Sequence, residues 1–196
     1  HRDVRYHGVK STWERLDVVL DVVEQSSRGL VYAYDSRLDH SGHLDGCASS
    51  AWQETLASID ADIAQLREEL PNDTVLLVTA DHGMIDLPED GRFDLETVPE
   101  LRHGVELVAG EARLRHLYAG PGATDDVLAC WREVMGDRAI VELRDDLVDW
   151  FGPMAAEVRG RFGDVIVASL GEFAVFSSLD FPQEFMLRGF HGSVSE

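Results

Sequence analysis

Two short apolar runs, residues 30–34 and 74–79, constrain the fold of this 196-residue chain more than any other feature. Both are rich in β-branched or aromatic residues and carry no charge, as the buried strands of a parallel sheet usually do. Between them, apolar side chains recur over residues 52–70 in alternating steps of three and four, which predicts an amphipathic helix. Strand, helix and strand in this order predict a βαβ unit with a right-handed crossover.

The remaining segments predict an antiparallel part attached to this parallel core. Ser11 and Glu14 have the spacing of a capping box, so we expect a helix that begins there and ends near Gln25. The fold class expected is α/β, a mostly parallel sheet flanked by helices with a small antiparallel appendage. The other expected elements are a loop at 35–48, an irregular excursion at 84–102, antiparallel strands at 105–108 and 114–118, a helix at 124–135 capped by Thr124, a strand at 139–143, a short helix at 145–151, and a hairpin of 163–168 with 173–176.

The charge of the chain excludes several classes of partner. There are 17 Lys and Arg residues against 37 Asp and Glu residues, a net charge of −20 with neutral histidine. Such a chain does not suit a nucleic-acid groove, where affinity comes from cations on phosphates, or an anionic lipid surface. No apolar run reaches the roughly 18–20 residues of a membrane span. An anionic substrate would also be repelled, unless a local charge reverses the field.

Acidic residues and histidines follow both apolar runs. Residues 39–43 read Asp-His-Ser-Gly-His and residues 81–83 read Asp-His-Gly. The carboxyl ends of parallel strands meet at one edge of a sheet, so we expect these clusters to converge there. Carboxylate oxygen and imidazole nitrogen suit zinc and similar divalent ions, and Gly42 and Gly83 would let the backbone turn tightly beside them. Residues 189–192 supply a third, glycine-flanked histidine.

Each of these clusters taken alone has an ordinary alternative. Asp39 and His43 could be a solvated, hydrogen-bonded pair, and His191 could be a surface or core histidine. We expect His40 to face solvent or to support a ligand. The expected shared edge is what favours a metal site.

At this point the motifs resemble a known family. Residues 79–84, Thr-Ala-Asp-His-Gly-Met, resemble the TADHGM signature of the alkaline phosphatase superfamily, in particular its type I phosphodiesterase/nucleotide pyrophosphatase branch. Residues 39–46 match the D-x-x-G-H-x-x-G element of that branch, and residues 189–192 match its G-x-H-G element. The resemblance runs along most of the chain and is strongest in residues 30–84 and 186–196.

The resemblance implies a hydrolase with two divalent metal ions, most often zinc. One ion would be bound by Asp39, His43 and His191, and the other would receive Asp81 and His82. The second ion would also need an Asp and a Thr or Ser nucleophile from a strand-to-helix turn upstream. No segment matches that turn, because Ser11 is interpreted as a helix cap. The resemblance therefore implies no catalytic nucleophile in this chain.

On this interpretation the chain is the C-terminal portion of a single alkaline phosphatase-like domain. Residues 1–83 would be the βαβ core with the metal motifs, residues 84–185 an antiparallel insertion, and residues 186–196 the returning ligand segment. The expected function is that of a metal-dependent phosphodiesterase or nucleotide pyrophosphatase acting on a small phosphate ester such as a nucleotide, present as a fragment that is inactive alone. Bound divalent ions would neutralise the site carboxylates and supply the positive field that the composition lacks.

Two other functions remain open. The first is another hydrolase of the same superfamily, such as a phosphomonoesterase, a phosphonoacetate hydrolase or a sulfatase. The second is a non-catalytic metal-binding module. If the chain is a fragment, a cut edge of the sheet would expose strand hydrogen bonds and apolar surface, and we expect the chain to self-associate through it.

Overall fold

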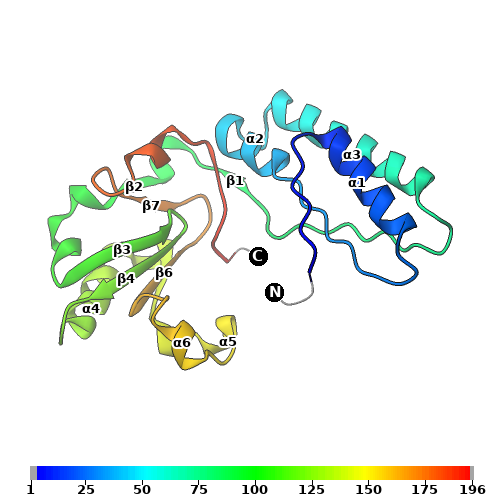
Figure 1. The fold of residues 1–196 in the computed structure, drawn as a ribbon. Helices are drawn as coiled ribbons and strands as arrows, with labels where there is room; N and C mark the ends of the chain where they lie inside the picture. The colour runs from blue at the N-terminus through cyan, green and yellow to red at the C-terminus, as the bar shows by residue number, and fades with distance from the viewer. Residues whose placement is uncertain (1–3, 195–196) are drawn as a thin grey trace. The chain divides into compact units, whose positions relative to one another are not determined.

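The computed structural model describes residues 4–194, and the chain divides into two compact units. Unit 1 comprises residues 1–41 and 48–81, and unit 2 comprises residues 42–47 and 82–196, each as far as the chain is described. Figure 1 follows the chain by colour from the N-terminal helices to the C-terminal strands. No helix among the described residues is long and apolar enough to span a membrane.

Unit 1 contains two helices that pack against each other, α1 (Thr12–Glu24) and α3 (Ser50–Glu69). The Ser11 hydroxyl accepts a hydrogen bond from the Glu14 amide at 3.2 Å, and the Glu14 carboxylate accepts one from the Lys10 amide at 2.6 Å. The predicted capping box is thus confirmed, although the return bond reaches Lys10 and not Ser11. The long amphipathic helix is confirmed as well.

The two apolar runs do not form the expected strands. Residues 30–34 and 74–79 have no regular secondary structure, and Leu30 and Leu77 are 94% and 83% exposed. A strand exists only where a neighbouring backbone supplies its hydrogen bonds. The described residues of unit 1 contain no strand that could do so. The predicted βαβ unit is therefore wrong for the described part of the chain.

Residues 37–45 form a helix, α2 (Arg37–Asp45), and not the expected loop. Asp35 caps its start, because its carboxylate accepts from the Arg37 amide at 3.0 Å and from the guanidinium of Arg15 at 2.6 Å. Burial acts to raise the pKa of Asp35, but hydrogen bonds from Arg37 and the charge of Arg15 hold it below its ordinary value. Gly46, with φ at 90°, follows the last turn. An acidic cap before a helix and a glycine after it are ordinary start and stop signals.

Unit 2 is built on a four-stranded antiparallel sheet with the order β3-β4-β6-β5. Helix α4 (Thr124–Met135) packs on it, and the fully buried Trp131 donates its Nε1–H to the carbonyl of Leu101 at 3.0 Å. The antiparallel strand predictions are confirmed. The helix prediction is confirmed too, but Thr124 is the first helical residue and not the cap. The strands are β3 (Val105–Glu111), β4 (Leu114–Ala119), β5 (Ala139–Leu143) and β6 (Val165–Ser169).

Two short strand pairs complete unit 2. β1 (Ile85–Asp86) pairs antiparallel with β8 (Gly189–Phe190), and β2 (Arg92–Asp94) pairs parallel with β7 (Ala174–Phe176). The predicted hairpin of β6 with β7 is wrong, because β4 and β5 already occupy both edges of β6. Among the described residues the only parallel pairing is β2 with β7, so the mostly parallel sheet is not found there.

The remaining elements are short. The irregular excursion at 84–102 is confirmed, and the short helix at 145–151 is present as a 3-10 turn followed by α5. These elements are α5 (Val148–Phe151), α6 (Ala156–Arg159) and the 3-10 turns Glu89–Gly91, Leu95–Thr97, Pro99–Arg102, Gly136–Arg138, Arg144–Asp146 and Pro182–Met186.

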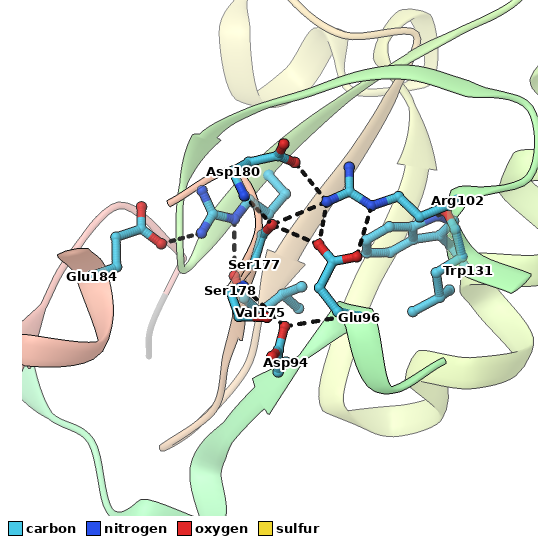
Figure 2. A network of polar contacts seen from close by, with 11 residues as sticks. Asp94, Glu96, Arg102, Trp131, Val175, Ser177, Ser178, Asp180 and Glu184 are labelled. Atoms are coloured by element: carbon cyan, nitrogen blue, oxygen red, sulfur yellow. Dashed lines mark hydrogen bonds and ion pairs between the residues drawn. The ribbon is translucent and has the colours of Figure 1, made fainter. Parts of the chain in front are cut away.

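A polar network ties the irregular segments of unit 2 to its strands (Figure 2). The guanidinium of Arg102 donates to the carboxylates of Glu96 and Asp180 and to the hydroxyl of Ser177, the last two at 2.6 and 3.0 Å. Ser177 in turn donates to Glu96 at 2.7 Å and accepts from the Asp180 amide at 2.9 Å. Hydrogen bonds to charged groups contribute about 1.5–3 kcal/mol each, so this network stabilises a region with little regular structure.

Candidate metal centre

Three histidines from motifs far apart in the sequence come together in unit 2. The rings of His82 and His191 are stacked, with centroids 3.8 Å apart and planes at 19°. The ring of His43 lies 5.0 Å from that of His191, at 54°. The structure therefore brings together one histidine from each of the three motifs identified in the sequence.

Backbone pairing around β1 and β8 produces this convergence. His82 lies three residues before β1, and His191 directly follows β8, so the ladder between these strands brings their segments together. The Arg188 amide donates to the carbonyl of His43 at 2.7 Å, which attaches the end of α2 to the same pair. The three histidines are thus positioned by hydrogen bonds between short segments.

Two glycines allow β8 to approach α2 closely. A Cβ atom on Gly189 would lie 2.4 Å from the Gly42 carbonyl oxygen and 2.7 Å from the Met84 Sδ. Gly42 lies inside α2, so its expected role in a tight turn is wrong, and its backbone is instead the surface that β8 contacts. Gly83 has no positive φ and nothing within 4 Å of its Cβ position, so a tight turn does not require glycine there either.

Each of the three histidines has its Nδ1 next to an oxygen. For His43 the partner is the Gly189 carbonyl at 2.8 Å, and for His82 it is the Gly83 carbonyl at 3.0 Å. For His191 it is the Glu111 carboxylate at 3.0 Å. Carbonyl and carboxylate oxygens only accept, so this hydrogen-bond network assigns the proton to Nδ1 in all three rings. A histidine that donates from Nδ1 presents Nε2 to a metal.

The two predicted carboxylate ligands belong to unit 1. Asp39 lies one helical turn before His43 on α2, so the two side chains share a face of that helix. Asp81 directly precedes His82 in the sequence. The charge of Asp81, then burial, then the charge of Asp39 raise the pKa of Tyr34 above its ordinary value, so both carboxylates lie near one phenol. His40 is exposed, as expected.

Asp86 fixes the end of the helix that carries His43. Its carboxylate accepts from the Cys47 amide at 2.6 Å, and a Cβ on Gly46 would lie 3.0 Å from both of its oxygens. Burial, followed by the charge of Asp86, raises the pKa of the Cys47 thiol to about 11, so this thiol stays protonated at neutral pH. The sequence pattern does not indicate these roles of Asp86 and Glu111, because their partners are distant along the chain.

The three histidines of unit 2 are of a residue type that suits a divalent transition metal. Neutral imidazole nitrogen is a preferred ligand of zinc. A hydrogen bond from Nδ1–H to an oxygen acceptor usually orients such a ring, as it does for each of these histidines. Three imidazoles, one from each motif, lie in one unit, with ring centroids 5.0 Å apart for His43 and His191 and 3.8 Å apart for His82 and His191.

Proteins of known function resemble parts of this chain. Phosphopentomutases of Clostridium kluyveri and Clostridioides difficile are 26% and 23% identical over 121 and 120 residues, which cover 59% of this chain and 30% of each enzyme. Mouse ectonucleotide pyrophosphatase/phosphodiesterase 5 superposes with a TM-score of 0.74 at 16% identity, and the human protein with 0.71 at 20%. Both comparisons cover 97% of this chain and 50% of the solved chain, so this chain spans about half their length.

The fold class expected from the sequence, α/β and alkaline phosphatase-like, is confirmed by this structural likeness. The model of the type I phosphodiesterase/nucleotide pyrophosphatase family matches residues 1–194, which is nearly the whole chain. This match extends beyond the three short motifs and includes the segments between them. The chain therefore belongs to the type I phosphodiesterase/nucleotide pyrophosphatase family.

Proposed function

We propose that this chain is part of a metal-dependent phosphoric ester hydrolase of the phosphodiesterase/nucleotide pyrophosphatase type. The observation that carries the proposal is the convergence of His43, His82 and His191 in unit 2, each from a motif that also holds an acidic or glycine partner. Chance rarely places three imidazoles from distant segments together with every Nδ1 bonded to an oxygen. Membership of the family gives this arrangement its chemical meaning.

In the proposed site Asp39, His43 and His191 would hold one divalent ion, and Asp81 and His82 would contribute to a second. Zinc is the favoured metal, since both ligand types suit it. Bound ions would supply the positive charge that orients a phosphate ester and stabilises its transition state. The chain's own residues hold the ligands in place, because β1 and β8 fix the three rings. This local charge also explains how a chain with a net charge of −20 could bind an anionic ester.

The substrate proposed is a small phosphate ester, with a nucleotide as the first candidate. The solved structures of the mouse neighbour include an inactive variant in complex with AMP. The second candidate is another member of the superfamily acting on a phosphate monoester, because the curated relatives are phosphopentomutases. Rates on matched mono- and diester substrates, measured on a protein of the relatives' full length, would separate the two.

We further propose that this chain alone is catalytically incomplete. No segment of the sequence matches the family's strand-to-helix turn with its Thr or Ser nucleophile, and Ser11 serves as the cap of α1. Residues 1–83 would be the part with the metal motifs, residues 84–185 the antiparallel insertion, and residues 186–196 the returning ligand segment.

Zinc titration by calorimetry tests the site directly. The chain should bind zinc, and His43→Ala and His191→Ala should each weaken binding at least about tenfold, since each removes a ligand. His40→Ala is the matched control, because His40 is exposed on the same helix. Absence of zinc binding by the unaltered chain, or an equal effect of all three substitutions, would overturn the proposed site.

A second measurement tests the missing nucleophile. The chain should not hydrolyse bis(p-nitrophenyl) phosphate in the presence of zinc. Turnover that persists through purification and is lost in His82→Ala would show that the chain supplies its own nucleophile.

A further inference from the structure

We propose that Glu111 is the positioning residue of His191, holding its ring by the Nδ1–H so that Nε2 faces the metal. This inference rests on the proposed function, since it concerns a ligand of the proposed site. Glu111 belongs to none of the three sequence motifs. It connects the antiparallel sheet of unit 2 to the last ligand of the chain.

The contact between the two side chains is direct. The Nδ1 of His191 lies 3.0 Å from the Oε2 of Glu111. The His191 side chain is 15% exposed and that of Glu111 is 57% exposed, so the ring is largely buried while the carboxylate reaches solvent.

The backbone that carries Glu111 is held by a buried cation. Glu111 is the last residue of β3, and the side chain of Arg115 on β4 is fully buried beside that strand end. Arg115 donates to the carbonyls of Gly110 and Val175, both at 2.9 Å, and pairs with Glu184. These contacts hold the backbone at the end of β3 in place, and with it the backbone of Glu111.

The residue after the ligand accommodates the carboxylate. Gly192 has φ at 101°, and a Cβ there would lie 2.7 Å from the Oε2 of Glu111. Any other side chain would be strained in that backbone conformation and would also crowd the carboxylate. The next residue, Ser193, donates its hydroxyl to the carbonyl of Ser169 on β6. His191 is thus fixed by its own side chain and by the backbone after it.

His191 differs from the other two histidines in the kind of acceptor it has. His43 and His82 donate to backbone carbonyls, whereas His191 donates to a charged carboxylate. A carboxylate acceptor increases the electron density on the ring and makes Nε2 a stronger ligand. Removing such a support typically weakens metal affinity by about 10–100-fold.

The test compares Glu111→Ala and Glu111→Gln with the control Glu106→Ala, which removes an exposed carboxylate from the same strand. Nitrogen NMR of the imidazoles in the metal-free chain should show His191 protonated at Nδ1 in the unaltered protein, in Glu111→Gln and in Glu106→Ala. Glu111→Ala should show a mixture of the two tautomers. The carboxamide oxygen of Gln still accepts the hydrogen bond but carries no charge. Glu111→Gln therefore separates the effect of orienting the ring from the effect of the negative charge.

Zinc calorimetry on the same proteins gives the second measurement. Glu111→Ala should weaken binding about 10–100-fold, Glu111→Gln by less, and Glu106→Ala not measurably. An unchanged tautomer and unchanged affinity in Glu111→Ala would overturn the inference while the proposed site stands. If the unaltered chain binds no zinc, the proposed function fails, and the tautomer measurement still decides the contact between Glu111 and His191.

Discussion

Replacing Gly189 by alanine tests the close contact between β8 and α2. The added Cβ would lie 2.4 Å from the backbone oxygen of Gly42, whereas real Cβ contacts stay beyond 3.0 Å. The obstacle is backbone inside a helix, so the strand has to move away by roughly 0.6 Å or more in a close-packed interior. The contact with the Met84 sulfur at 2.7 Å adds to the crowding.

Two kinds of cost add up in this variant. Overpacking of a well-packed region costs about 1–3 kcal/mol. Displacing β8 also weakens the bond from the Arg188 amide to the His43 carbonyl and the bond from the His43 Nδ1 to the Gly189 carbonyl, at about 1 kcal/mol each. The free energy of unfolding of unit 2 should therefore fall by about 3–5 kcal/mol, a large share of an ordinary domain's stability.

The assay is urea unfolding followed by the fluorescence of the buried Trp131, together with amide exchange of a peptide covering residues 186–191. Protection of the Arg188 amide should be lost in Gly189→Ala. Gly83→Ala is the matched control, because nothing lies within 4 Å of its Cβ position, and it should change stability by less than about 0.5 kcal/mol. A loss below about 1 kcal/mol in Gly189→Ala, with exchange unchanged, would refute the reasoning.

Three further predictions concern other parts of the chain. Burial lowers the pKa of His116 below its ordinary value of 6.5, so the folded state favours the neutral ring. The stability that this ring contributes is present above pH 6.5 and is lost as the pH falls toward the lowered pKa. His116→Gln should therefore make the melting temperature depend less on pH between about pH 7 and 5, as measured by thermal melting. Arg115→Leu should lower the free energy of unfolding in urea by about 3–5 kcal/mol, because it leaves the carboxylate of Glu184 without its cation. Adding Glu184→Gln should recover part of this loss. A double variant that is no more stable than the single one would contradict this reasoning. The exposed runs 30–34 and 74–79 should make the chain self-associate, so light scattering should give a mass that rises with concentration, and a monodisperse monomer would count against it.

The sequence predicts those elements whose determinants are local. Helix α3 follows from its periodicity, α1 from its capping box, and β3 and β4 from short apolar stretches that pair with near neighbours. Residues 30–34 and 74–79 fail as strands because apolar composition indicates burial but does not supply a pairing partner. The strand at 173–176 is present as β7, but its predicted pairing with β6 fails for a related reason, since both edges of β6 are already occupied.

The candidate site divides in the same way. The motifs identify His43, His82 and His191 because each stands beside a glycine or an aspartate in a short pattern, and the structure brings the three rings together. Glu111 and Asp86 hold ligand-bearing segments through contacts between residues far apart in the sequence, and such contacts leave no local pattern to detect.

The arginines of unit 2 have a consequence for how an anion would approach it. Arg113 and Arg115 are buried and direct their guanidinium groups to interior carbonyls, so their charges lie away from the outer surface. At long range an approaching phosphate ester is repelled by the net charge of −20, in which these arginines are already counted. Added salt screens this repulsion over a Debye length of about 10 Å at 0.1 M. The association rate of an anionic ligand should thus increase with ionic strength, the opposite of what a basic phosphate-binding surface gives.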